Sequence, residues 1–297
     1  MNQQIGIVTV LYNSESVLSD YFASLKNQTY QNFILYVIDN KSPDNALALS
    51  IQLAQKNTFK TVFIENSDNF GVAKGNNIGI QKAIEDGCDM VLLSNNDVTL
   101  EEDTIEKLLS ELVSRKASMA VPKIYYFGTR LFWAAGGSFH KKSGINIHRG
   151  LQQYDIGQYQ NTEQITFAPT CFMLIRKEVF EKIGLMDENY FVYWDDTDFV
   201  YRAIKQQETL WYVPESVVYH KEGTSTGTMS DFSIRFLNRN FVYFALKNYS
   251  RPYAYYVILY NIAIHIVKNI YKWPFPKWKL GLKAFKEGFN YYYHASI

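Results

Sequence analysis

The sequence has few cysteines and almost no net charge, and each shortage excludes a class of protein. Cys88 and Cys171 are the only cysteines among 297 residues, and they form neither a CxxC pair nor a zinc-finger spacing. A disulfide-stabilised secreted scaffold is therefore excluded, and a reduced, cytosolic setting fits this cysteine usage. The 30 basic and 29 acidic side chains give a net charge of +1, so the molecule as a whole has no field that would attract nucleic acid.

Several common catalytic motifs are also missing. The sequence has no GxGxxG after its first apolar run, no GxxxxGKS/T and no HExxH. These absences disfavour nucleotide-binding oxidoreductases, P-loop enzymes and zinc proteases. The chain enters a strand-like run directly after MNQQ, so we expect no secretory signal peptide.

The first 115 residues alternate between two kinds of segment. Short apolar runs rich in β-branched residues lie at 5–11, 33–38, 61–64 and 90–93, and segments with helical spacing lie at 14–26, 44–56, 72–85 and 101–113. This alternation predicts an α/β fold, a parallel sheet with helices on both faces. The rhythm is lost after Pro122, and the remaining predictions are loops and short strands over 125–164, a strand over 165–175, a helix over 177–183 and a strand over 211–219.

Polar residues follow each of the first four predicted strands. They are Tyr12-Asn13-Ser14, the stretches 39–44 and 66–69, and Ser94-Asn95-Asn96-Asp97. Each group alone is typical of a turn or a helix N-cap. Because neighbouring parallel strands end at one edge of a sheet, four such groups favour a ligand site there. Gly71, Gly75 and Gly79 open the following helix, either to bring backbone N–H groups near a phosphate or to let the helix pack closely.

The segment 190–202, YFVYWDDTDFVYR, has three carboxylates within four residues among aromatic side chains. Burying such charges costs free energy unless a partner compensates. Asp198 and Arg202 have the i, i+4 spacing of a helical ion pair, which predicts a structural role for Asp198. We expect Asp195 and Asp196 at a strand end or turn, where they point in different directions. A carboxylate at the edge of an apolar pocket can act as a general base, and one of this pair fits that description.

His220 has the most informative position among the five histidines. It follows the predicted strand 211–219 and precedes a loop rich in Gly, Thr and Ser. The residue type alone leaves a ligand role and a structural role open. The other histidines, which have no comparable setting, are His140, His148, His265 and His294.

Six motifs, taken in order and spacing, resemble the inverting glycosyltransferases of family 2, in the branch of rhamnosyl- and galactofuranosyl-type transferases. They are VTVLYN, VIDNKSPD, NFGVAKGNN, LLSNNDV, YFVYWDDTDFVYR and VVYH, within residues 5–247. The resemblance implies the GT-A fold, the α/β fold of nucleotide-diphospho-sugar transferases with a Rossmann-like mixed sheet, and a helical C-terminal extension. It implies a catalytic domain over 1–230, with a donor-binding half at about 1–123 and an acceptor-binding half at about 124–230. A helical, basic and aromatic C-terminal region follows over 231–297.

The same resemblance assigns roles on the donor side. Asp39 would accept a hydrogen bond from the N3–H that uracil and thymine carry, which implies a UDP- or dTDP-sugar. The other donor-binding positions are Thr9, Tyr12, Asn13, Asp68, Asn77, Asn95 and Asn96. The family's Asp-X-Asp motif falls on 95–97, so Asp97, together with His220, would hold Mn²⁺ or Mg²⁺. Asn95 stands where the family has an Asp, which removes one charge from that site.

On the acceptor side, the resemblance assigns two carboxylates. Asp196 matches the family's catalytic base, which would take the proton of an acceptor hydroxyl as its oxygen attacks the anomeric carbon. Asp195 would orient the acceptor hydroxyls. A single displacement of this kind inverts the anomeric configuration.

The C-terminal part of the chain is basic and aromatic. From residue 235 onward, ten Lys and Arg stand against one acid, Glu287, and 18 of 63 residues are aromatic. We expect helices here, with breaks near 250–252 and 273–276, and an apolar stripe at Tyr255, Ile258, Leu259, Ile262, Ala263, Ile266, Val267 and Ile270. The stripe would lie on an anionic membrane surface or pack on protein. Sixteen residues separate Arg251 from Lys268, roughly 24 Å of helix, which is too short to span a bilayer.

Together these patterns predict a metal-dependent inverting glycosyltransferase. It would move a sugar, with rhamnose as a candidate, from a UDP- or dTDP-sugar to a glycan or lipid-linked acceptor in bacterial surface polysaccharide synthesis. The expected location is cytoplasmic, peripheral at the inner face of the cell membrane, and a homo-oligomer is compatible with the sequence. The alternative is a non-catalytic partner subunit that binds nucleotide-sugar or glycan in a polysaccharide assembly complex.

Overall fold

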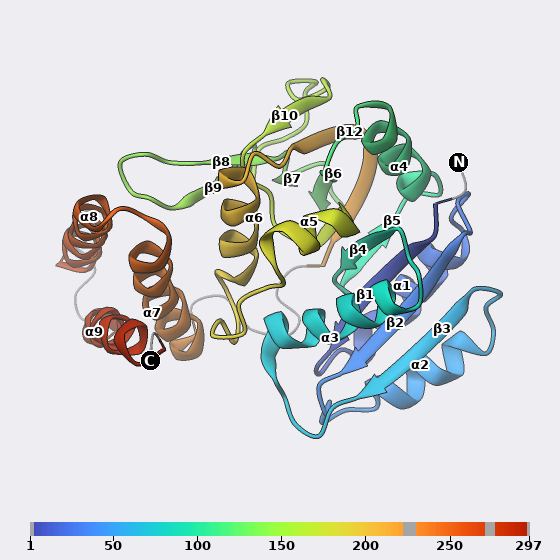
Figure 1. Ribbon diagram of the computed structural model, residues 1–297, viewed down its shortest axis with the longest axis horizontal. Helices are drawn as coiled ribbons and strands as arrows, with labels where there is room; N and C mark the ends of the chain where they lie inside the picture. Colours follow the sequence, from blue (N-terminus) through green and yellow to red (C-terminus); the bar gives the residue numbers. More distant parts are fainter. Residues whose placement is uncertain (1–2, 222–229, 271–276, 296–297) are drawn as a thin grey trace.

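The computed structural model describes residues 3–221, 230–270 and 277–295. Figure 1 shows a central sheet with helices on both faces and a group of three helices, α7, α8 and α9, at one side. The described chain therefore has the mixed α/β architecture and the helical C-terminal region that the sequence predicts.

The strands begin and end close to the predicted positions in the first hundred residues. They are β1 (Ile5–Leu11), β2 (Phe33–Asp39), β3 (Lys60–Glu65), β4 (Met90–Ser94), β5 (Val98–Leu100), β6 (Met119–Tyr126), β7 (Phe132–Ala134), β8 (Gly137–Phe139), β9 (Asn146–His148), β10 (Glu163–Ile165), β11 (Phe172–Arg176) and β12 (Leu210–His220).

The main sheet has the order β10-β12-β6-β11-β4-β1-β2-β3, with β5 paired to β12 and β7 paired to β6. β4, β1, β2 and β3 are parallel, whereas β11 runs antiparallel to its neighbours β4 and β6. β8 and β9 form a separate antiparallel pair. The predicted parallel sheet is confirmed for these four strands, and beyond β4 the sheet is mixed.

The helices cover both faces of this sheet. They are α1 (Glu15–Lys26), α2 (Ala46–Ala54), α3 (Gly71–Glu85), α4 (Thr104–Ser114), α5 (Lys177–Ile183) and α6 (Asp195–Lys205). The predicted helices in the first 115 residues are confirmed to within a few residues at each end, and the predicted helix over 177–183 is α5.

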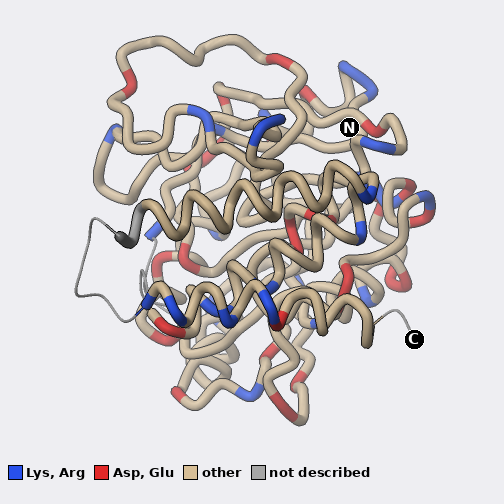
Figure 2. The backbone as a smooth tube through the Cα atoms, turned by 90° about the vertical axis from the view of Figure 1, so that its left-hand side faces the viewer, with Lys and Arg blue, Asp and Glu red and all other residues tan. Residues whose placement is uncertain are grey.

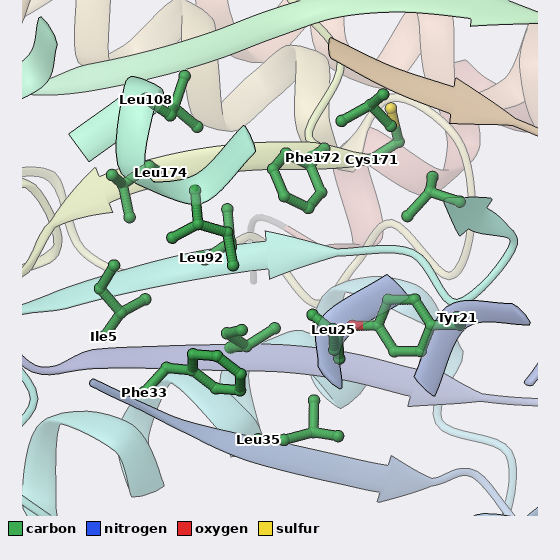
Figure 3. Packing of buried hydrophobic residues seen from close by; sticks show 14 of the residues in the cluster. Ile5, Tyr21, Leu25, Phe33, Leu35, Leu92, Leu108, Cys171, Phe172 and Leu174 are labelled. Atoms are coloured by element: carbon green, nitrogen blue, oxygen red, sulfur yellow. The ribbon is translucent and has the colours of Figure 1, made fainter. Parts of the chain in front are cut away.

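The core has two layers, one on each face of the sheet. All seven residues of β2 are buried, and successive side chains belong to opposite layers, Leu35 to the layer under α1 and α4 and Tyr36 to the layer under α3 and α6. This is the period of two that a strand buried on both faces requires. Figure 3 shows side chains of the first layer, among them Leu25 of α1, Leu108 of α4 and Leu92 of β4.

Two predictions about local structure were wrong, and one strand, β6, was not predicted. The run 165–175 is not one strand, because it is interrupted between β10 and β11 where Pro169 has no N–H for a ladder. β6 continues through Pro122, which pairs with Val213 at an irregularity in the register of β12. Asp195 and Asp196 do not end a strand, because they are the first two residues of α6.

The C-terminal helices are α7 (Asp231–Asn248), α8 (Arg251–Ile270) and α9 (Lys277–Ala295). The break expected near 250–252 lies between α7 and α8, and the one near 273–276 lies outside the described residues. The predicted apolar stripe of α8 is only partly buried, because Ile258 is buried while Leu259 and Val267 are 65% and 53% exposed. Nowhere in the described parts of the chain is a helix long and apolar enough to cross a membrane.

Candidate active site

Two adjoining cavities lie beyond the carboxyl ends of β1 and β4, the edge where parallel sheets bind ligands. The first has a volume of about 520 Å³, and its wall includes Tyr12, Asn40, Gly71, Asn95, Asn96, Asp97, Phe191 and Phe232. The second has a volume of about 400 Å³, and its wall includes Trp133, Asn146, His148, Thr170, Cys171, Asp195, Asp196 and His220. Val72, Asn95 and Val192 belong to both walls, so the cavities are neighbours.

Asp97 and His220, 123 residues apart in the chain, meet at the border of these cavities. Asp97 lies between β4 and β5, and His220 is the last residue of β12, where it pairs with Val98 of β5. The ladder between β5 and β12 brings His220 Nε2 to 3.1 Å from Asp97 Oδ1. The backbone N–H of Lys221 also donates to the Asp97 carbonyl, at 2.8 Å.

This pair fits a divalent cation in its donor chemistry. A carboxylate oxygen and an imidazole nitrogen suit Mn²⁺, and two ligands at right angles on one ion lie about 3 Å apart. The buried Nδ1 of His220 has no hydrogen-bond partner within the described residues. Across those residues, no three His, Cys, Asp or Glu side chains form a metal-binding group.

Asp195 and Asp196 start α6 after an unusual turn. Tyr193 and Trp194 both have left-handed backbone conformations, with φ of 62° and 69°. Such conformations are costly for residues other than glycine. The turn puts Asp195 and Asp196 on the wall of the second cavity, with Asp195 buried and Asp196 half-buried. The Thr197 N–H and hydroxyl donate to Asp196 Oδ1.

The two carboxyl groups differ in their electrostatics. Burial, together with the neighbouring charge of Asp196, raises the pKa of Asp195 to about 8. Burial also raises the pKa of Asp196, but hydrogen bonds from Thr197 and the charge of His148 oppose that rise. Burial of two adjacent carboxyl groups therefore favours a proton on the pair, while the hydrogen bonds from Thr197 favour the ionised form of Asp196.

Asp198 has the structural role predicted for it. Its side chain is fully buried, and Arg202 Nε lies 2.8 Å from its Oδ2. Lys247 Nζ lies 2.9 Å from Asp198 Oδ1, and Asn248 donates to the same oxygen at 2.8 Å. These partners compensate the buried charge.

The predicted donor-binding residues fall into two groups. Tyr12, Asn95 and Asn96 line the first cavity, and Asn96 is fixed by a 2.8 Å hydrogen bond to the Val10 carbonyl. The residues that the structure does not place on that wall are Thr9, Asn13, Asp39, Asp68 and Asn77.

Each of these five has another environment. Thr9 is completely buried. The Asn77 side chain accepts a hydrogen bond from the Met186 N–H and donates one to the Met186 carbonyl. Asp68 is exposed and accepts from the Asn69 N–H, and Asn13 is an exposed residue with a φ of 55°. Asp39 accepts from the Ser42 N–H and stands next to Asn40, which does line the cavity.

The glycines of α3 also divide in function. A Cβ on Gly75 or Gly79 would lie 2.8 Å from Val10 or 2.3 Å from Val8, so both positions serve close packing on β1. Gly71 has a φ of +80°, and a Cβ there would lie 2.2 Å from the Phe191 carbonyl. Gly71 thus allows α3 to begin against the loop that leads to Asp195.

His148 and Trp133 are site residues that the sequence did not reveal. Trp133 lies between two histidines, with ring centres 4.5 Å from His220 and 5.0 Å from His148. All three line the second cavity beside Asp196. Trp133 and His148 come from the irregular region 125–164, where no periodicity predicted which side chains point to the site.

Comparison with known proteins identifies the family. The family model described as Glycosyl transferase family 2 matches residues 6–184. This chain belongs to that family. The glycosyltransferase is 24% identical over 223 residues to the dTDP-rhamnosyl transferase RfbF of Shigella flexneri, covering 75% of this chain and 71% of the relative. It is 24% identical over 252 residues to the low-salt glycan biosynthesis hexosyltransferase Agl10 of Haloferax volcanii, covering 82% and 78%.

Solved structures agree on the GT-A fold of this glycosyltransferase. S. aureus TarS 1-349 in complex with UDP-GlcNAc matches with a TM-score of 0.63 at 14% identity, covering 97% of this chain and 81% of that one. GalNAc-T7 with UDP, GalNAc and Mn²⁺ matches with a TM-score of 0.63 at 17% identity, covering 82% and 47%. At these identities the likeness establishes the fold.

Proposed function

We propose that this glycosyltransferase transfers a sugar from a UDP- or dTDP-sugar to a hydroxyl of a glycan or lipid-linked acceptor, with inversion at the anomeric carbon. The observation that carries the proposal is the pair of adjoining cavities, with Asp97 on the first wall and His220 and Asp196 on the second. A donor in the first cavity and an acceptor in the second would meet at their common wall.

On the donor side, Tyr12 and Asn40 provide a ring face and an amide for the nucleotide. Asp39 keeps lone pairs for a pyrimidine N3–H beside its bond to Ser42. Asp97 and His220 would hold Mn²⁺ or Mg²⁺, which would neutralise the diphosphate as it leaves. The relative named a dTDP-rhamnosyl transferase and the neighbour bound to UDP and Mn²⁺ support this choice of donor and metal.

On the acceptor side, Asp196 serves as the general base. It takes the proton of the acceptor hydroxyl while the oxygen forms a bond to the anomeric carbon, and the electron pair of the broken C–O bond leaves with the diphosphate. Protonated Asp195 can donate a hydrogen bond to an acceptor oxygen. The aromatic wall at Trp133 gives the sugar an apolar surface.

The transferred sugar is a hexose, with rhamnose as the first candidate, and the product contributes to a bacterial surface polysaccharide. The named relatives, a dTDP-rhamnosyl transferase and a hexosyltransferase of glycan biosynthesis, support this choice.

The test measures turnover of a panel of UDP- and dTDP-sugars in the presence of Mn²⁺. The measured quantity is the UDP or dTDP released. We expect Asp196→Asn to lower turnover on the order of 100-fold, because a general base contributes that much or more, while UDP binding is kept. The matched control is Asp103→Asn, which changes a half-buried aspartate outside both cavities that pairs with Lys107 on α4.

An Asp196→Asn protein as active as the parent would remove the proposed base. Binding of a donor without release of nucleotide under any condition would instead support the non-catalytic partner subunit. Analysis of the anomeric configuration of the product decides between inversion and retention.

We further propose that the C-terminal helices attach the enzyme to an anionic membrane surface. Along 252–267, α8 has no charged residue, and it exposes Tyr256, Leu259 and Val267. On α9, Lys279, Lys283 and Lys286 are exposed at helical spacing. Figure 2 shows the basic positions of α9 beside the uncharged stretch 252–267 of α8. Apolar and cationic side chains together suit an anionic bilayer, where a lipid-linked acceptor would lie.

A further inference from the structure

The left-handed turn before Asp195 has a partner outside the sheet. Tyr193 and Trp194 adopt positive φ without being glycine, and such a conformation persists only where the surroundings hold it. The contacts that hold it come from α7, which begins about 35 residues later in the chain.

Asn240 of α7 makes the central contact. Its side chain is completely buried, and its Nδ2 donates to the carbonyl of Val192 at 2.8 Å and to the carbonyl of Tyr193 at 3.0 Å. Its Oδ1 accepts from Arg239 Nε at 2.7 Å. An amide is suited to this place, because both N–H groups of Nδ2 donate to carbonyls while Oδ1 accepts a hydrogen bond from Arg239.

Two further contacts of α7 flank the same turn. The Trp194 ring packs on Phe241 and Phe244, with ring centres 5.3 and 5.1 Å apart. Beyond the two aspartates, Lys247 and Asn248 bind the Asp198 carboxylate. α7 therefore holds the chain on both sides of Asp195 and Asp196.

We propose that Asn240 is a positioning residue, which sets the place of Asp196 in the second cavity by fixing the turn that precedes it. The inference rests on the proposed role of Asp196 as base. It gives α7 a part in turnover in addition to any part in membrane attachment. Asn240 itself lines neither cavity, but Val192 and Tyr193, whose carbonyls it binds, do, so its effect passes through the turn.

The test compares Asn240→Leu, which removes both hydrogen bonds to the turn and the one from Arg239, with two other substitutions on α7. Asn238→Leu changes the same residue type, whose amide donates within the helix to the Ile234 carbonyl at 2.7 Å. Val242→Ala removes two methyl groups from a completely buried side chain next to Gly288 of α9, so it loosens α7 without touching the turn. All are assayed as the full chain, well below their unfolding temperatures.

We expect Asn240→Leu to lower kcat at least tenfold, to leave UDP affinity within twofold of the parent, and to shift the acidic limb of the kcat–pH profile. Asn238→Leu and Val242→Ala should keep the parent's kcat and profile. Asn240→Ser, which keeps one donor, should fall between parent and Asn240→Leu, and it serves as the test variant if the leucine protein does not fold.

Two results would overturn the inference. One is an Asn240→Leu or Asn240→Ser protein with the parent's kcat and pH profile. The other is a Val242→Ala protein that loses as much kcat as Asn240→Leu, since stability alone would then explain the effect. An active Asp196→Asn protein would instead refute the proposed base, so the two failures are distinguishable.

Discussion

Asp195 and Asp196 are adjacent in the chain but differ in their surroundings, and that difference separates their proposed roles. Asp195 is 5% exposed, and its pKa is raised by burial and by the charge beside it. Asp196 is half-buried and accepts two hydrogen bonds from Thr197. A neutral acid beside an ionised base is an arrangement that can both bind and deprotonate a hydroxyl.

The raised pKa of Asp195 predicts a pH dependence of stability. A carboxyl group with a higher pKa in the folded state stabilises the protein below its unfolded pKa, near 4, and loses that contribution as the pH rises to about 8. Asp195→Asn should therefore raise the free energy of unfolding at pH 8 by about 1 kcal/mol or more, and by less at pH 5. Thermal unfolding at both pH values measures this, and a gain that is equal at both would contradict it.

His220 is predicted to determine the metal requirement. Removing one of the two protein ligands leaves Asp97 alone, so His220→Ala should raise the Mn²⁺ concentration for half-maximal donor turnover on the order of tenfold or more. His140→Ala is the control, because His140 is an exposed histidine bonded to Ser143 outside both cavities. An unchanged Mn²⁺ requirement in His220→Ala would exclude His220 as a ligand.

The sequence located some residues of the site better than others. The family resemblance predicted that Asp97 and His220 act together, and the structure places them 3.1 Å apart. The sequence did not reveal His148 or Trp133, since their positions depend on loop geometry. The resemblance also assigned Thr9 to the donor site, yet Thr9 lies within β1 and is completely buried.

At the scale of elements, the packing of α3 on β1 depends on two glycines. A Cβ on Gly79 would lie 2.3 Å from Val8 Cγ1, so Gly79→Ala should destabilise the protein by about 1–3 kcal/mol through overpacking, although alanine is the better helix former. Urea unfolding measures this. In the double variant Val8→Ala/Gly79→Ala the clash is removed, so its destabilisation should be smaller than the sum of the two single changes; additivity would contradict the packing argument.

The elements most accurately predicted are those whose pattern is local. The first four strand–helix units alternate in hydrophobicity, and their bounds differ by only a few residues from prediction. Pro122 lies inside β6 because the irregular register of β12 opposite Val213 accommodates it, and no local pattern indicates that. The interruption at Pro169, in contrast, could have been predicted from the proline itself.

At the scale of the molecule, membrane attachment makes a charge-dependent prediction. Changing Lys279, Lys283 and Lys286 to Glu should abolish flotation with vesicles that contain phosphatidylglycerol, since roughly 1 kcal/mol of attraction per cation is lost and repulsion is added. The control changes three exposed lysines elsewhere, Lys26, Lys56 and Lys205, and should float as the parent does. A parent protein that does not float with anionic vesicles would refute the attachment.

The position of the C-terminal helices could not be predicted from sequence. Helical periodicity shows which side of α8 is apolar, but not what covers it. In the structure, α8 packs against residues 141–144, where Asn261 donates to the Ser143 carbonyl and Tyr253 to the Lys141 carbonyl. The same helix is therefore partly buried against the catalytic region and partly exposed, and the sequence offered these as alternatives.

One helix takes part in both halves of the site. The start of α7 contributes Phe232 to the first cavity, its middle contributes Leu237 to the second, and Asn240 fixes the turn before Asp195. Replacing the segment after residue 230 with that of a relative would therefore change side chains that line both cavities. Such chimaeras would differ in turnover even where their location in the cell is unchanged.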